Sequence, residues 1–187
     1  MAADKIDKIE LDLQKYIQEI KENVSKSMGD KENVFNHPKI DKISLNAGVG
    51  RLENKDKEEV FKYLLDLTGQ KPKKVITKKS IASFKLRKGD LVGISVTLRG
   101  KKAYNFLLNL VYLALPRTRD FKGVKSESFD SQKLTYSLGI PSASIFPTIG
   151  FSSTINFGLQ INIVFKTQGE KNKILLEKAN LPFVKNK

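Results

Sequence analysis

The stretch from Leu91 to Arg99, with the sequence LVGISVTLR, limits the possible folds more than any other part of the chain. Every second side chain is apolar, and the others are small, polar or cationic. The apolar set is Val92, Ile94, Val96 and Leu98, and the second set is Gly93, Ser95, Thr97 and Arg99. A period of two places these sets on opposite faces of a β-strand. The sheet is therefore expected to have one hydrophobic face packed against another layer and one polar face left free.

Further strands are predicted from similar patterns elsewhere in the chain. In IDKISLN, apolar Ile43 and Leu45 alternate with Lys42, Ser44 and Asn46. In INFGLQINIVFKT, near the C-terminus, the polar side of the alternation holds Gln160, Asn162 and Lys166. The runs LTYSLGI and SIFPTI are also interpreted as strands.

Helices are predicted where apolar residues recur at intervals of three and four. The first helix is expected to end near Gly29, and its apolar stripe is Ile6, Ile9, Leu13, Ile17, Ile20 and Val24. The second covers residues 56–67 and stops at Gly69, a left-handed cap; its inward side is Val60, Phe61, Leu64 and Leu65. A third, apolar almost all round and so expected to be buried, spans residues 101–115 and ends at Pro116. A closing helix covers residues 170–179.

The order of these elements predicts an α+β fold. We expect a two-layer sandwich, with a largely antiparallel sheet, helices packed on one face and an extended basic loop. With 187 residues and 40% hydrophobic content, the chain can bury one ordinary core. We therefore expect a single domain over residues 1–187, with an N-terminal helix in residues 1–30 and the basic loop in residues 71–89.

The net charge of +14 lies almost entirely in the middle of the chain. Residues 71–125 contain 15 Lys and Arg against 2 Asp and Glu, whereas residues 1–70 contain 12 against 14 and residues 126–187 contain 7 against 4. An ordinary soluble surface mixes its charges, so this segregation indicates a polyanionic partner.

The densest part of this charge is the run TGQKPKKVITKKSIASFKLRKG, residues 68–89. Apolar residues are threaded through it, which predicts two short strands joined by a basic loop rather than a charged tail. Phe84 and Phe121, each flanked by Lys or Arg, are candidates for stacking on bases. A solvated loop is the alternative interpretation of the run.

Catalytic and metal sites are hard to find in this sequence. With no cysteine and one histidine, His37, the chain lacks the usual nucleophile-and-base pairs and zinc ligands. Gly48 and Gly50 follow a predicted strand, but no third glycine completes a dinucleotide motif, so a tight turn and a phosphate-admitting loop both remain open. We expect no enzymatic activity, no cofactor and no metal.

The sequence also predicts a soluble, intracellular protein that does not bind a membrane. The N-terminus is too rich in acids for a signal or transit peptide. The longest apolar run, from Ala103 to Leu115, is shorter than the roughly 20 residues of a membrane helix. The basic residues lie on no long amphipathic helix.

Six runs, in this order and spacing, carry a family resemblance: LTGQKP (67–72), KKSIASFKLRKG (78–89), VTLRG (96–100), ALPRTRDFKG (114–123), SFD (128–130) and IFP (145–147). They closely resemble the bacterial-type large-subunit ribosomal protein that binds 5S rRNA, number five in its series. The resemblance covers about Pro38 to Phe183.

This resemblance implies a structural role in the central protuberance of the large ribosomal subunit. The implied partners are 5S rRNA, 23S-type rRNA, peptidyl-site tRNA, a small-subunit head protein across an inter-subunit bridge, and other 5S rRNA-binding large-subunit proteins. The implied location is the cytoplasmic ribosome rather than an organellar one.

The resemblance also assigns site residues. Contacts with 5S rRNA are expected at Lys42, Asn46, Gln70, Thr97 and Arg99. A loop on the tRNA side is expected to use Lys73, Lys74, Lys78, Lys79, Ser80, Ser83, Lys85 and Arg87, with Lys78, Lys79 and Ser80 near its tip. The inter-subunit side is expected to present Arg117, Arg119 and Lys122.

Three other functions are compatible with parts of the pattern. One is a general RNA-binding or polyanion-binding protein that is not stably attached to the ribosome. Another is a binder of anionic membranes. The third is an RNA-acting enzyme, but Asp90 and Asp120 are the only acids near the basic run, and a metal-dependent enzyme needs a carboxylate cluster.

Overall fold

A five-stranded sheet forms the centre of the protein in a computed structural model, which describes residues 2–28, 36–84, 86–119, 121–146 and 155–184, with side chains from Gln14 onward. Its strands are β1 (Ile40–Gly48), β2 (Lys73–Ile76), β3 (Leu91–Arg99), β4 (Thr135–Ile140) and β5 (Leu159–Phe165). Their order across the sheet is β2-β3-β1-β5-β4, and all neighbouring pairs are antiparallel. β1 is thus the central strand.

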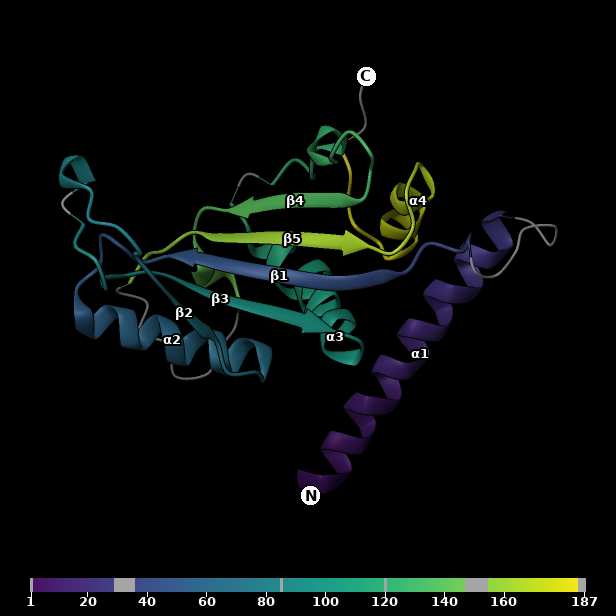
Figure 1. Cartoon of the computed structure of the whole chain (residues 1–187). Coiled ribbons are helices and arrows are strands. Elements are labelled where there is room, and N and C mark those ends of the chain that lie inside the picture. Colours follow the sequence, from purple (N-terminus) through teal and green to yellow (C-terminus); the bar gives the residue numbers. More distant parts are fainter. Residues whose placement is uncertain (1, 29–35, 85, 120, 147–154, 185–187) are drawn as a thin grey trace.

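The helices pack on one side of this sheet. They are α1 (Ala2–Met28), α2 (Asn54–Thr68), α3 (Lys101–Asn109) and α4 (Lys171–Lys178). Figure 1 shows α3 behind the central strands and the sheet in front of it. The predicted α+β sandwich, with helices on one face of an antiparallel sheet, is confirmed.

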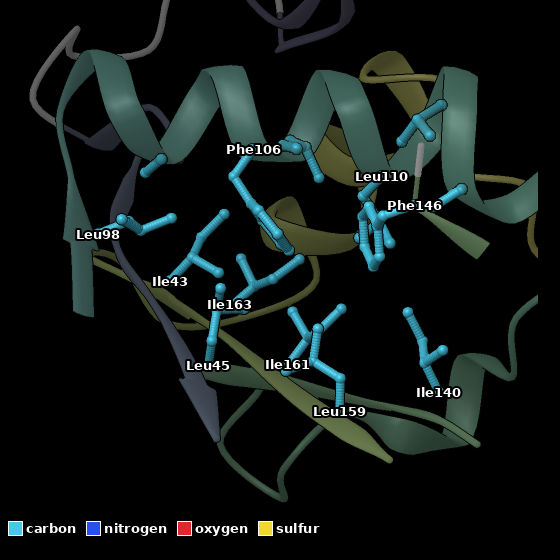
Figure 2. Packing of buried hydrophobic residues seen from close by; sticks show 14 of the residues in the cluster. Ile43, Leu45, Leu98, Phe106, Leu110, Ile140, Phe146, Leu159, Ile161 and Ile163 are labelled. Carbon is cyan, nitrogen blue, oxygen red and sulfur yellow. The ribbon is translucent and has the colours of Figure 1, made fainter. Parts of the chain in front are cut away.

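The hydrophobic core lies between the sheet and α3 (Figure 2). Ile43, Leu45 and Leu98 project from β1 and β3 and are fully buried. They meet Phe106 and Leu110, which point down from the helix layer. Full burial of each such side chain stabilises the fold by about 1.5–3 kcal/mol relative to exposure. The alternation seen in the sequence therefore decides which face of the sheet is covered.

The second half of α1 docks on the helix layer. Tyr16, Ile20 and Val24 are buried, and the Tyr16 hydroxyl donates to the Ala179 carbonyl at 3.0 Å. The Tyr16 ring also meets Tyr112 edge-on, with 6.0 Å between ring centroids. Burial raises the pKa of the Tyr16 phenol well above its usual value. The predicted stripe residues Ile6, Ile9 and Leu13, and the predicted end at Gly29, lie outside the described side chains and residues.

The helix predicted over residues 101–115 is present, but its type changes along its length. The α-helix ends at Asn109, continues as a π-turn over Leu110–Ala114 and closes with a 3₁₀ turn over Leu115–Arg117. The Leu115 N–H donates to the Leu110 carbonyl, five residues back. Pro116 clashes with the carbonyl four residues before it in an α-helix, and the wider turn relieves that clash. Tyr112 and Leu113 are exposed there, so this segment is not buried all round as predicted.

Two smaller predictions also need correction. In the run SIFPTI, Ala143–Ile145 forms a 3₁₀ turn instead of a strand, and residues 147–149 lie outside the described residues. On α2, Leu65 is exposed and Tyr63 is buried. The hydroxyl of Tyr63 donates to the Ala143 carbonyl at 2.5 Å, a bond that the spacing of apolar residues cannot reveal.

Candidate nucleic-acid interface

The side of the sheet away from the helices, here called the open face, carries almost only small, polar and cationic residues. Strand register defines its members as Lys73 and Val75 on β2; Gly93, Ser95, Thr97 and Arg99 on β3; Lys42, Ser44, Asn46 and Gly48 on β1; Gln160, Asn162 and Val164 on β5; and Thr135, Ser137 and Gly139 on β4. None of these residues is acidic. The open face can therefore approach a polyanion without charge repulsion.

Register also brings the polar side chains into rows across the strands. Asn46 lies opposite Ser95 on one side and Gln160 on the other, and Ser44 lies opposite Thr97 and Asn162. Directly opposite Cβ atoms in such pairs are about 4.5–5.5 Å apart. Amide and hydroxyl groups thus form a continuous hydrogen-bonding surface on a rigid support.

Gln70 reaches this surface from the end of α2. Gly69 ends the helix with φ 60° and ψ 23°, and its N–H donates to the Leu65 carbonyl at 2.8 Å. The chain then turns so that the Gln70 Nε2 donates to the Thr97 carbonyl at 3.0 Å. Because β2 pairs with β3 only up to Ser95, Gln70 satisfies the strand edge just beyond that pairing. The predicted contacts Gln70 and Thr97 therefore lie side by side.

Two cations lie together at one end of the open face. Lys42 on β1 lies directly opposite Arg99 on β3. Arg99 also approaches Asp41 at 3.5 Å, but its side chain remains 63% exposed, and such surface pairs contribute little free energy. Two neighbouring positive groups repel each other unless an anion lies against them. All five predicted 5S rRNA contacts thus belong to one surface, with Asn46 and Thr97 exposed.

Beyond β2 the chain forms a projection, residues 77–90, here called the basic finger. At its base the Thr77 N–H donates to the Asp90 carbonyl at 2.9 Å, and the Gly89 N–H donates to the Thr77 carbonyl at 3.0 Å. Farther out, Ile81 and Leu86 form an isolated antiparallel bridge. Figure 1 shows the finger extending past the end of the sheet. Of the two predicted strands in this region, β2 is present and the second is reduced to this bridge.

The tip of the finger is the 3₁₀ turn Ala82–Phe84. The exposed residues Lys78, Lys79 and Ser80 precede the bridge, so they lie along one arm and not at the end. Ser80 Oγ accepts a bond from the Lys88 N–H at 3.1 Å, which holds the two arms together. Ser83 and Arg87 are exposed, and Lys85 lies outside the described residues.

Two aromatic residues and two lysines from the basic central part of the chain differ in their surroundings. Phe84 at the tip is 72% exposed, whereas Phe121 packs partly against the core. Lys73 projects from the open face, opposite Ser95. Lys74 points to the other face, where its Nζ lies 5.4 Å from the centroid of the Phe61 ring. Phe84 thus remains available for stacking, and Lys74 serves mainly to cover α2.

The residues predicted for the inter-subunit side form a third, separate group. Arg117 lies in the 3₁₀ turn after the π-turn, and Arg119 and Lys122 follow it. All three are exposed. They follow the helix layer and belong neither to the open face nor to the basic finger.

Sequence reasoning missed part of the open face. Gln160 and Asn162 showed the same alternation as Asn46, and Ser137 lies in the strand run LTYSLGI, yet none was chosen as a site residue. The missing information was strand order, because alternation shows which face a residue occupies but not which strands are neighbours.

The described residues contain no group of three or more His, Cys, Asp or Glu side chains that is placed to hold a metal ion. None of the helices in the described part of the chain is both long enough and apolar enough to cross a bilayer.

Comparison with known protein families shows which family the chain belongs to. Residues 33–87 match the family model described as ribosomal protein L5, and residues 91–183 match the model described as the C-terminus of the same ribosomal family. The chain belongs to the ribosomal protein L5 family. The first match ends within the basic finger and the second begins at β3, so together they include all five strands of the sheet.

Individual relatives agree over nearly the whole chain. Large ribosomal subunit protein uL5 of Desulforapulum autotrophicum is 42% identical over 172 residues, which cover 90% of this chain and 95% of that protein. The uL5 protein of Lactobacillus johnsonii is 42% identical over 178 residues, covering 92% and 97%. The protein uL5c of Cyanidium caldarium is 44% identical over 156 residues, covering 81% and 85%.

Membership of the L5 family confirms two predictions made from the sequence. The chain is a structural constituent of the large ribosomal subunit and takes part in translation. It is not an enzyme, because the L5 family is a family of structural ribosomal proteins.

Proposed function

We propose that the open face of the sheet binds 5S rRNA in the central protuberance of the large subunit, and that the chain acts there as one RNA-binding domain. One observation supports this most strongly: Asn46, Gln70 and Thr97 come from separate parts of the sequence and meet on one uncovered surface. The bond from Gln70 to the strand edge keeps its amide group beside Thr97.

The proposed contacts divide into two kinds. Lys42 and Arg99 neutralise phosphates and supply most of the affinity that depends on salt. Asn46 and Thr97 form directional hydrogen bonds with sugars and bases, which fix the register of the RNA. Gln70 holds the Thr97 backbone through its Nε2, and its side-chain oxygen faces the RNA.

The shape of the surface suits a folded RNA loop better than a regular duplex. In a double-stranded RNA helix the major groove is too deep and narrow for side chains to read, and the shallow minor groove is recognised mostly by its shape and 2′-hydroxyls. Loops and bulges present unstacked bases, which amides and hydroxyls can recognise. We therefore place an irregular region of 5S rRNA against the rows of Asn46 and Ser44.

The decisive experiment is a filter-binding assay with Thr97→Val. Because the side chain is exposed and valine suits a strand, the variant should keep its fold. We expect 5S rRNA binding to weaken by about 1 to 3 kcal/mol, since an RNA group buried at the contact loses its partner. Thr118→Val, at a position beyond the helix layer, is the matched control and should bind as the wild type does.

A competition assay separates this function from general polyanion binding. Unlabelled duplex DNA and anionic lipid vesicles should displace 5S rRNA far less well than unlabelled 5S rRNA does. If Thr97→Val keeps wild-type affinity and the DNA competes equally, the assignment to 5S rRNA is rejected.

Two further contacts of the same protein are proposed. The basic finger reaches peptidyl-site tRNA, and its exposed lysines and Phe84 support this role. Arg117, Arg119 and Lys122 face a small-subunit head protein across an inter-subunit bridge, and their exposure on a separate surface supports it. In this arrangement 23S-type rRNA and other 5S rRNA-binding proteins of the large subunit are neighbours, in the cytoplasmic ribosome.

A further inference from the structure

A hollow of about 630 Å³ lies on the open face, at the end of the sheet away from Lys42 and Arg99. It is bounded by β1, β4 and β5, and its lining residues are Asn46, Gly48, Ser137, Leu138, Gly139, Ile140, Pro141, Gly158, Leu159 and Gln160. One water molecule takes up roughly 30 Å³. The hollow is therefore large enough for a small molecule or for one group of a larger ligand.

Missing side chains create this hollow. Gly48, Gly139 and Gly158 lie on three neighbouring segments around it. A Cβ atom placed on Gly48 or Gly139 would meet nothing within 4 Å, and neither residue has a left-handed backbone. Neither close packing nor a left-handed turn therefore requires glycine at these two positions. Any side chain at these positions would project into it.

Polar groups on one wall are aimed at this space. Asn46 and Gln160 are directly opposite each other across β1 and β5, and Gly139 lies on the far side of Gln160. Within the described residues, the Asn46 side chain makes no hydrogen bond to another protein group. The Gln160 Nε2 has one long contact, at 3.4 Å to Asn162 Oδ1. Both amides thus have donors and acceptors to offer a ligand.

We propose that this hollow receives one unstacked base of the bound RNA. The base lies flat over the glycine backbone and Pro141, and the amides of Asn46 and Gln160 bond its polar edge. Extruding a base costs least where the RNA is already single-stranded, as in a loop. This inference rests on the proposed binding of 5S rRNA to the open face.

Charge distinguishes a base from a phosphate as the occupant. The lining of the hollow contains no lysine, arginine or acid. Of the cations on the open face, Lys42 and Arg99 lie at its other end, six residues along β1, which corresponds to about 20 Å at the rise of a strand. Lys73 lies on β2, the edge strand opposite β4. Phosphate contacts are therefore assigned to Lys42 and Arg99, and the neutral hollow is assigned to a base.

The test fills the hollow and measures the affinity for 5S rRNA transcribed in vitro. Gly139→Val adds a side chain that strands tolerate, at a position with open space, and should weaken binding about tenfold or more. Gln160→Met removes the amide without adding a charge or much changing the size of the side chain, and should have a similar effect. Ser25→Leu adds bulk at an exposed position of α1, on the helix side and not on the open face, and should bind within about twofold of the wild type.

The identity of the occupant is tested on the RNA side. Chemical probing of the complex should reveal one base that the wild type protects and Gly139→Val leaves reactive. Removing that base, as an abasic substitution, should weaken wild-type binding and make the wild type and Gly139→Val equal in affinity. Thermal unfolding of each variant establishes that its fold is kept. Gln160 is exposed, so Gln160→Met serves if Gly139→Val is unstable.

The outcomes separate this inference from the function on which it rests. If Thr97→Val weakens binding while Gly139→Val and Gln160→Met bind normally, the hollow is empty in the complex and the inference is overturned, although the open face still binds RNA. If the wild type itself shows no preference for 5S rRNA, both ideas fail together.

Discussion

Gly69 is a single residue on which the position of Gln70 depends. Its φ of 60° lies in the left-handed region, which costs about 1–2 kcal/mol for a residue that carries a Cβ atom. A Cβ atom at this position would meet nothing within 4 Å, so the cost would come only from the backbone. The Lys102 Nζ, which donates to the Gly69 carbonyl at 2.8 Å, further fixes this turn.

We predict that Gly69→Ala lowers the free energy of unfolding by about 1 kcal/mol, measured by urea denaturation. The matched control is Gly139→Ala, where the Cβ also enters open space but the backbone is not left-handed. That control should be as stable as the wild type or slightly more stable. Equal losses in both variants would contradict the role given to the backbone of Gly69.

Side chains differ in how far the sequence alone could place them. Alternation within one strand was sufficient to put Asn46, Thr97 and Arg99 on the free face, because a period of two has only two outcomes. Alternation could not show that Gln70 and Thr97 lie side by side, since their bond joins residues 27 positions apart and depends on how α2 meets β3. The resemblance to a family pointed to Gln70 without explaining what holds it.

The basic finger is an element whose cations are not involved in holding it together. Its arms are joined by main-chain bonds and by Ser80 and Thr77, whose hydroxyl donates to the Arg87 carbonyl. Asp90 Oδ2 accepts from the Arg87 N–H at 2.7 Å, so the one acid at its base is engaged with the backbone. Lys78 and Lys79 are exposed, and their charge can change while the finger keeps its shape.

We predict that replacing Lys78 and Lys79 together by glutamine leaves the affinity for isolated 5S rRNA within about twofold, since phosphate contacts on the open face remain. In vitro translation by ribosomes that carry the variant should be impaired. Lys55→Gln with Lys62→Gln, on the exposed side of α2, removes the same charge and should affect neither measurement. A large loss of 5S rRNA affinity in the finger variant would show that the finger binds 5S rRNA, which contradicts its assignment to tRNA.

Prediction of elements succeeded where a pattern was long and failed where a turn interrupted it. β3 was predicted to the residue, because nine consecutive residues keep the alternation. The change from α-helix to π-turn after Asn109 was not predicted. It arises from the backbone's response to Pro116, and the run of apolar residues continues through it with no change in pattern. The second strand predicted in the basic region is only the isolated bridge between Ile81 and Leu86, because the short apolar pattern there supports no further residue pairs.

In the whole molecule, one face of the sheet is apolar and covered by helices, and the other is the polar and cationic open face. The central block of the sequence, residues 71–125, supplies β2, β3 and the basic finger, and it carries nearly all of the net charge. β1 and β5 contribute mainly amides and hydroxyls between these cations and the hollow. Charge and selectivity are thus carried by different strands of one sheet.

This division predicts different responses to salt. The logarithm of 5S rRNA affinity should fall linearly with the logarithm of salt concentration, and Lys42→Gln should reduce the slope by about 0.7 to 0.9 as one phosphate contact is lost. Thr97→Val should weaken binding at every salt concentration and leave the slope unchanged. Parallel lines for Lys42→Gln and the wild type would show that Lys42 touches no phosphate.

The place of β1 between β3 and β5 has a consequence for how the protein is made. Residues 40–48 cannot complete their pairing until residues 159–165 have been synthesised and have left the exit tunnel. Pairing over so great a distance along the chain closes slowly. A nascent chain therefore keeps one edge of β1 unpaired until β5 emerges, and the hollow between β1, β4 and β5 forms only after that.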